Sequence, residues 1–310
     1  MKKQLLSFLL TLIFSFTMVV PGFAADAAIP VADKVTAMEK LLYGTGQSGS
    51  LIQRMDSLED DVYGTVTSDA ILKRIDNLYD YLQSSDSNEA SFATRLNTVE
   101  WRFSETMSDA PAKTRIENTE KLVNGNASSG ALSVRLDELL KLASYENGNL
   151  PVQKVTLPKD TVIKIEFTEE MSTKTSRKDD KVNFKVADNY YMNDVLVIPK
   201  GAKGVGTIAK VVQPSSFGKD GRIDINFSHV VAVDGTNVAV MVGDLAKQQA
   251  TSIAGAAGAT IGGMVILGPI GAVGGAFVKG KSVTIPAGSA TYVQTSEAVE
   301  MQGVVCETNE

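Results

Sequence analysis

Hydrophobic positions follow two different periods along the chain, and the change falls near residue 150. Before that point an arginine recurs about every 20 residues, and apolar residues stand at offsets of −3, +1, +4 and +8 from it. Intervals of four, three and four residues place these side chains on one stripe of an α-helix. The pattern therefore predicts six helical repeats over residues 26–147, with Lys34 at the matching place in the first. The arginines that define the other five are Arg54, Arg74, Arg95, Arg115 and Arg135.

Each repeat also carries signals for the ends of its helix. Residues able to cap a first turn stand six positions before four of the arginines, namely Ser48, Ser68, Asp109 and Ser129. Pro111 lies just inside the fifth start. Glycines suited to end a helix close three copies, at Gly44, Gly64 and Gly125. We expect helices of about 15 residues, packed antiparallel in a bundle or curved array. One long coiled coil is the alternative, because the repeat length nearly equals three heptads.

The repeated arginine has two interpretations. It could belong to a ligand site, or it could pair with acidic residues that stand at +2 and +5 of neighbouring helices. The regular occurrence of acids at these offsets favours the second, structural interpretation.

After residue 150, short β-branched runs alternate apolar and polar residues, as in TVIKIEF and KVNFKVA. Such runs are typical of strands. A corner motif separates them three times, as TLPKDT (156–161), VIPKGA (197–202) and TIPAGS (284–289), and proline followed by glycine or aspartate makes a tight turn. The pattern predicts an all-β barrel or sandwich over residues 151–300 and a polar tail over 301–310. The fold class is therefore α+β, with two domains.

The order of LPKDTVIKIEF, MSTKTSRKDDKVNFKV, VLVIPKGAKGVGTI and GRIDINFSHVVAVDGTNVAV resembles the β-barrel domain of VirB10/TrbI-type secretion-channel proteins and related exported bacterial β domains. The similarity covers about residues 155–245. It implies a β-barrel fold, a ring assembled in the cell envelope, and an apolar helical hairpin that contacts the outer membrane. This chain departs from the family pattern, because helical repeats replace the inner-membrane anchor and proline-rich linker, and because its apolar insert is richer in glycine.

That apolar insert, residues 247–279, interrupts the strand pattern. Between Lys247 and Lys279 no residue is charged, and Gly268 and Pro269 predict a turn between two helical arms, about 250–267 and about 270–278. Small residues spaced mostly by four lie on one face of these arms, where backbones can approach closely: Ala254, Gly258, Gly262, Gly271 and Gly275. Three interpretations stay open, namely a hairpin in contact with a membrane, a glycine zipper between subunits, and a hairpin folded onto its own domain.

The first 25 residues have the pattern of a signal peptide. Lys2 and Lys3 precede the apolar run LLSFLLTLIFSFTMVV, and small residues then suit cleavage after Ala24 or Ala25. We therefore predict export to the periplasm, the outer membrane or the cell surface. Cys306 is the single cysteine, which excludes a disulfide within the chain, and its polar surroundings predict an exposed thiol.

Charge and composition argue against several classes of function. Residues 25–150 carry 12 Lys and Arg against 20 Asp and Glu, a net charge of −8, and residues 151–310 carry 16 of each. Neither half has the basic stripe that nucleic acid binding needs. His229 is the single histidine and lies in a strand pattern, so neither a zinc cluster nor a catalytic triad can be assembled.

The remaining polar motifs read as structural. The acidic pairs Glu169/Glu170 and Asp179/Asp180 resemble solvated turn residues, and STKTSRK (172–178) lacks the SxxK motif of penicillin-binding enzymes. We expect no cofactor, no metal and no small-molecule substrate.

The sequence thus predicts a non-enzymatic, exported bacterial cell-envelope protein with a structural, assembly or anchoring role. The insert would contact a membrane or another copy in a homo-oligomer, and the acidic repeats would face other envelope proteins. The alternative is a soluble surface module whose repeats recognise an envelope or host protein or a glycan. A cell-wall hydrolase using acids such as Glu169 or Asp180 is the third and weakest hypothesis.

Overall fold

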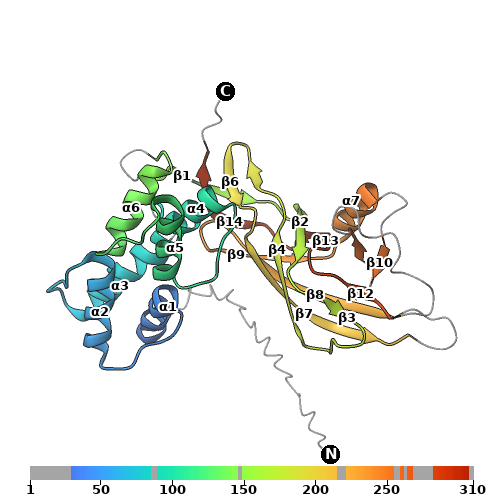
Figure 1. Cartoon of the computed structure of the whole chain (residues 1–310), viewed down its shortest axis with the longest axis horizontal. Helices are drawn as coiled ribbons and strands as arrows, with labels where there is room; N and C mark the ends of the chain where they lie inside the picture. Colours follow the sequence, from blue (N-terminus) through green and yellow to red (C-terminus); the bar gives the residue numbers. More distant parts are fainter. Residues whose placement is uncertain are drawn as a thin grey trace, which may run out of the picture.

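The computed structural model of the chain joins a helical domain to a β domain, and the two lie side by side (Figure 1). It describes residues 29–84, 89–145, 149–214, 221–254, 259–261, 264–267 and 282–306. The signal-peptide prediction, residues 1–25, lies outside this part of the chain.

Six helices form the first domain, one for each predicted repeat. Their bounds are α1 (Val31–Tyr43), α2 (Leu51–Tyr63), α3 (Ile71–Gln83), α4 (Phe92–Ser104), α5 (Ala112–Asn124) and α6 (Leu132–Leu142). Residues at +1, +4 and +8 of the repeat form the core, and in α2 these are Met55, Leu58 and Val62, all fully buried. Helices distant in the chain also touch, α1 with α5 and α2 with α6. The domain is therefore a bundle and not a single coiled coil.

The ends of the helices agree with the glycine signals but not with the predicted caps. Gly44, Gly64 and Gly125 each take the left-handed conformation that ends a helix. The helices begin three residues before the arginine, so the capping position is −4 and not −6. Ser50 and Ser91 cap two starts with their side chains. The capping position of the fifth start is Pro111, one residue before the helix.

The β domain is built on a closed six-stranded barrel in the order β13-β2-β4-β7-β8-β9. Its strands are β2 (Val162–Phe167), β4 (Lys181–Val186), β7 (Lys203–Val212), β8 (Arg222–Val231), β9 (Asn237–Met241) and β13 (Ala290–Thr295). A four-stranded sheet, β1-β14-β6-β5, lies between the barrel and the helices (Figure 1). Its strands are β1 (Val152–Leu157), β5 (Tyr190–Met192), β6 (Val195–Ile198) and β14 (Val299–Val305). A third, two-stranded sheet pairs β3 (Met171–Ser172) with β12 (Thr284–Ile285).

Alternation along the strands fills the barrel, as the pattern predicted. In β4 the residues Val182, Phe184 and Val186 are buried, while those between them face outward. The ring of Phe184 lies over Gly204, where a Cβ atom would stand 2.0 Å from the ring. Glycine at that position of β7 therefore makes room for an aromatic core residue.

The predicted polar tail, residues 301–310, needs correction. Residues 301–305 do not belong to a polar tail, since they lie in β14 and bury Met301, Gln302 and Val304. Strand pairing with β1 gives their backbone groups partners, which a count of polar residues does not reveal.

The predicted helical arm at 250–267 is helical only at its beginning. Helix α7 (Asp244–Ala254) gives way to strands β10 (Ala259–Ile261) and β11 (Met264–Ile266), which pair with each other. Met264 and Ile266 enter the barrel core, and this burial favours the strand over a glycine-rich helix, whose propensity is poor. Gly258, Gly262, Gly268, Pro269, Gly271 and Gly275 lie outside the described residues, as does the second arm, 270–278. Among the described residues, no helix combines the length and apolar content needed to cross a membrane.

Candidate functional site

The repeated arginines form a ladder of ion pairs through the helical bundle. Four of them donate from Nε and Nη2 to a glutamate that stands 15 positions earlier, which is the +5 position of the preceding repeat. The pairs are Arg54–Glu39, Arg74–Glu59, Arg115–Glu100 and Arg135–Glu120, each with a shortest distance of 2.7 or 2.8 Å. Arg74 also pairs with Asp56 at the +2 position. These are the acidic partners that the offsets indicated.

Each ladder glutamate also holds the loop that follows it. Glu59 accepts hydrogen bonds from the backbone N–H and the hydroxyl of Thr67, and Glu120 accepts one from the N–H of Ser128. Burial alone would raise the pKa of the Glu59 carboxyl, but hydrogen bonds from Arg74 and Thr67 outweigh it and hold that pKa below its ordinary value. One carboxylate thus joins a helix, its loop and the next helix.

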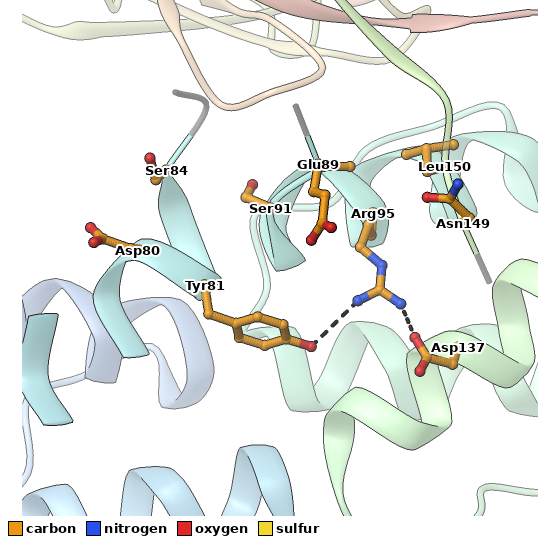
Figure 2. A pocket seen from close by; sticks show the side chains of 10 residues that line it. Asp80, Tyr81, Ser84, Glu89, Ser91, Arg95, Asp137, Asn149 and Leu150 are labelled. Atoms are coloured by element: carbon orange, nitrogen blue, oxygen red, sulfur yellow. Dashed lines mark hydrogen bonds and ion pairs between the residues drawn. The ribbon is translucent and has the colours of Figure 1, made fainter. Parts of the chain in front are cut away.

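The ladder is interrupted at Arg95. The interval from Arg74 to Arg95 is 21 residues instead of 20, so the +5 position of the preceding repeat is Tyr79, which has no carboxylate. Arg95 instead forms an ion pair with Asp137 of α6 and donates to the hydroxyl of Tyr81 at 3.3 Å (Figure 2). Its Nε is buried and has no hydrogen-bond partner among the residues that the structure describes. The series of arginine–glutamate pairs therefore lacks one member, the one between α3 and α4.

A pocket of about 380 Å³ opens where that pair is missing. Figure 2 shows the side chains that line it, and those with polar ends are Asp80, Tyr81, Ser84, Glu89, Ser91, Arg95, Asp137 and Asn149. Three carboxylates and one guanidinium can recognise a polar partner group. They offer no activated nucleophile and no matched acid and base. We take this Arg95 pocket as the candidate binding site of the helical domain.

Helix α4 also carries the junction between the two domains. Asn97 occupies the +2 position that holds an acid in the other arginine repeats. Its Oδ1 accepts from Arg115 at 2.8 Å, and its Nδ2 donates to the backbone carbonyl of Val233 at 2.9 Å. Trp101 donates from Nε1 to Asn189 of the β domain at 2.9 Å. Sequence reasoning missed Asn97, although the amide in place of an acid was a visible signal.

The connection after α4 adds further contacts to the junction. Glu105 pairs with Lys200 at 2.6 Å, and Asp109 pairs with Lys203. The hydrogen bond from Lys203 and its charge hold the pKa of the Asp109 carboxyl below its ordinary value. Between these pairs Gly201 approaches the backbone so closely that a Cβ atom would stand 2.6 Å from Cα of Thr106. The helical bundle and the barrel are therefore fixed to each other by specific contacts.

The side chains considered for catalysis do not converge. His229 lies in β8, half-buried, with Nδ1 3.1 Å from Ser228 Oγ, and burial lowers its pKa. Both predicted acidic pairs are exposed. Over the parts of the chain that the structure describes, no group of three or more His, Cys, Asp or Glu residues is placed to hold a metal ion.

Cys306 differs from its prediction. It is half-buried and not fully exposed, and its backbone N–H donates to the carbonyl of Asp194 at 2.9 Å. Burial raises the pKa of its thiol, so the reactive thiolate form is disfavoured.

No protein-family model matches the chain, and no curated protein matches it. Among solved structures, ComB10 of the Com type IV secretion system of Helicobacter pylori is similar to 47% of this chain and 89% of its own. The identity is 17% and the TM-score is 0.28. The chain therefore bears a distant structural resemblance to ComB10.

Proposed function

We propose that this protein is an exported, non-enzymatic component of a bacterial cell envelope that assembles or anchors other components. The observation that carries the proposal is the position of the uncharged segment, residues 248–278. It leaves the barrel after β9 and returns at β13, and these two strands are neighbours that pair at Met241 and Gln294. Connections between neighbouring strands tolerate insertions, which suits a contact element, although this one also supplies Met264 and Ile266 to the barrel core.

The surroundings of this excursion support the proposal. Helix α7 packs on β13 and β11, yet Leu245 and Ile253 on the same helix are 46% and 54% exposed. Helix α7 and strand β10 lie at the end of the β domain away from α1–α6 (Figure 1). An apolar contact with a membrane or another copy at that end would leave the acidic bundle free to meet partners.

The test replaces residues 270–278 with a Gly-Ser segment of the same length in the full chain. This replacement leaves β11 intact, because Met264 and Ile266 belong to the barrel core. We expect the natural protein to sediment with membranes, to resist alkaline extraction or to have an oligomeric mass, and we expect the variant to be soluble and monomeric. Fractionation and light scattering measure both properties.

A matched control replaces the polar segment 215–220 with Gly-Ser and should change neither property. A natural protein that is already soluble and monomeric would overturn the proposal.

The second candidate function is a soluble binding module, and the Arg95 pocket favours it. Where the arginine–glutamate pair is absent at Arg95, the repeats leave a polar pocket, and this pocket offers a recognition site in the helical domain. This candidate predicts that the Gly-Ser replacement at 270–278 leaves partner capture unchanged, so the same pair of variants separates the two functions.

A further inference from the structure

The six helices of the bundle are two copies of a unit of three helices. Helices α1 and α4 have the same length, as do α2 and α5. Each helix of the second half begins 61 residues after its counterpart in the first half, and the starting residues are Val31 and Phe92, Leu51 and Ala112, and Ile71 and Leu132. We call α1–α3 the first unit and α4–α6 the second unit.

The ion pairs of the bundle repeat with the same interval. Two arginine–glutamate pairs lie within each unit, and among the described residues none joins α3 to α4. Each unit is also closed by an ion pair between its first and third helices. The closing pair is Lys34–Asp76 in the first unit, at 2.8 Å, and Arg95–Asp137 in the second. The interruption of the ladder at Arg95 is therefore the boundary between two units of the same design.

Within the chain, the helix ends of the first unit contact the helix starts of the second. A Cβ atom added to Gly64, at the end of α2, would stand 3.4 Å from Cβ of Ala131, at the start of α6. Asp61, in the last turn of α2, pairs with Lys113, in the first turn of α5, at 3.4 Å. Helix α1 also contacts α5. We call this end-to-start arrangement the internal contact.

The backbone positions of the internal contact have counterparts that remain open. Gly125, at the end of α5, corresponds to Gly64, and an added Cβ atom there would have no described atom within 4 Å. Ala70, at the start of α3, corresponds to Ala131 and is exposed. The second unit therefore carries an open end and the first unit an open start, with the same glycine and alanine that meet inside the chain.

The ion pair of the internal contact has apolar counterparts on these open surfaces. Leu122 stands in the place of Asp61 and is 61% exposed, and Ile52 stands in the place of Lys113 and is 57% exposed. A single exposed apolar residue is ordinary. These two, however, occupy positions that are partners in the internal contact, so one could cover the other. Their burial against each other would remove apolar surface from water.

We propose that the end of α5 binds the starts of α2 and α3 of a second copy of this chain, with Leu122 against Ile52 and Gly125 against Ala70. The contact joins unlike surfaces, so each copy keeps one free surface and rows of copies grow as the concentration rises. The β domain already holds the end of α4 through Glu105, which makes this contact smaller than the internal one. We expect a dissociation constant on the order of 0.1–1 mM, so dilute protein stays monomeric. The contact is independent of the uncharged segment 248–278.

The test measures average mass by sedimentation equilibrium from about 10 µM to 1 mM protein. It uses the full chain with the Gly-Ser replacement at 270–278, so that association through the uncharged segment does not contribute. We expect the mass to rise beyond that of a dimer. Leu122→Asp and Ile52→Asp should each weaken the association by about tenfold or more, because a carboxylate would be buried without a partner.

An equimolar mixture of these two variants should associate again. The natural Leu122 surface of one variant then meets the natural Ile52 surface of the other. Growth should stop at the dimer, because both remaining surfaces carry a substitution. A contact between two like surfaces would not be restored by mixing.

Ile253→Asp is the matched control. Ile253 is 54% exposed on α7, at the end of the β domain away from the bundle (Figure 1), and its substitution should leave the association unchanged. Circular dichroism checks that each variant is folded. If one aspartate variant unfolds, Ala70→Trp obstructs the start of α3 and should abolish the association by itself. A monomer at 1 mM, a mixture no heavier than its components, or an equal loss in Ile253→Asp would each overturn the proposal.

Discussion

Single residues decide how the two domains meet. The +2 position of the repeat holds an acid in α2, α3, α5 and α6, whereas α4 has Asn97 there. An amide can both accept from Arg115 and donate to the carbonyl of Val233, whereas a carboxylate can only accept. An amide nitrogen in place of a carboxylate oxygen thus keeps the hydrogen bond to Arg115 within the bundle and adds a hydrogen bond to the β domain.

Asn97→Asp should destabilise the folded protein by about 2 kcal/mol. The new carboxylate keeps the partner Arg115 but places a negative oxygen against the buried carbonyl of Val233. Urea unfolding measures the loss. The matched control is the reverse exchange at the same repeat position, Asp56→Asn, where the side chain is 42% exposed and the expected cost is below about 1 kcal/mol. An Asn97→Asp variant as stable as the natural protein would contradict this role.

At the scale of elements, the ladder holds short helices in place. Helices of 13 residues are marginal by themselves in water, so their packing and their cross-links must stabilise them. Each glutamate of the ladder ties its own helix to a loop and to the next arginine. The repeat thereby supplies partners for the buried charges of the four arginine–glutamate pairs, whereas the buried Nε of Arg95 has none among the described residues.

Acid should weaken the helical bundle through this ladder. The pKa values of Glu39, Glu59 and Glu120 lie below their ordinary value of 4.5 in the folded chain. These carboxylates therefore favour the folded state above pH 4.5, and the advantage is lost as the pH falls through their folded pKa values. Urea midpoints followed by helical circular dichroism from pH 7 to pH 3 should fall in that window.

Glu59→Gln provides the control for the acid effect. It should lower the stability at pH 7, because Arg74 then lies nearly buried without that carboxylate, and it should flatten the dependence on pH. A variant whose stability falls with acid as steeply as that of the natural protein would exclude Glu59 as a source of the effect.

For the whole molecule, the close approach at Gly201 sets the position of the bundle on the barrel. Gly201 has a φ of +84°, and its Cα faces the backbone of Thr106. Two separate demands, a left-handed conformation and the absence of a side chain, therefore fall on one residue of the corner between β6 and β7.

Gly201→Ala should destabilise the protein more than Gly235→Ala. Gly235 has a φ of +88° but no neighbour within 4 Å of an added Cβ, so alanine there costs about 1–2 kcal/mol of backbone strain. At Gly201 the clash with Thr106 should add about 1–3 kcal/mol. Thermal and urea unfolding of both variants measure the difference. If both variants lose the same free energy of unfolding, the contact between Gly201 and Thr106 does not constrain the junction.

Much of this architecture was predictable from the chain. Local periodicity reflects which side chains must leave water, so the offsets from each arginine predicted six helices, and alternation predicted the strands of the barrel. The offsets of the acids also indicated the ion pairs, because residues one repeat apart meet on neighbouring helices. The glycines that end three helices were also predictable, because glycine readily adopts the left-handed conformation needed there.

Tertiary structure alone decided the remainder. Met264 and Ile266 lie in a strand because the barrel core buries them, whereas their glycine-rich surroundings suggested a helix. Residues 301–305 lie in β14 because β1 and β6 supply their backbone partners, which lie more than 100 positions earlier. The Arg95 pocket has no local signal, since it depends on side chains from distant elements. Local patterns determine which elements form, and contacts over long separations determine where they meet and what they leave open.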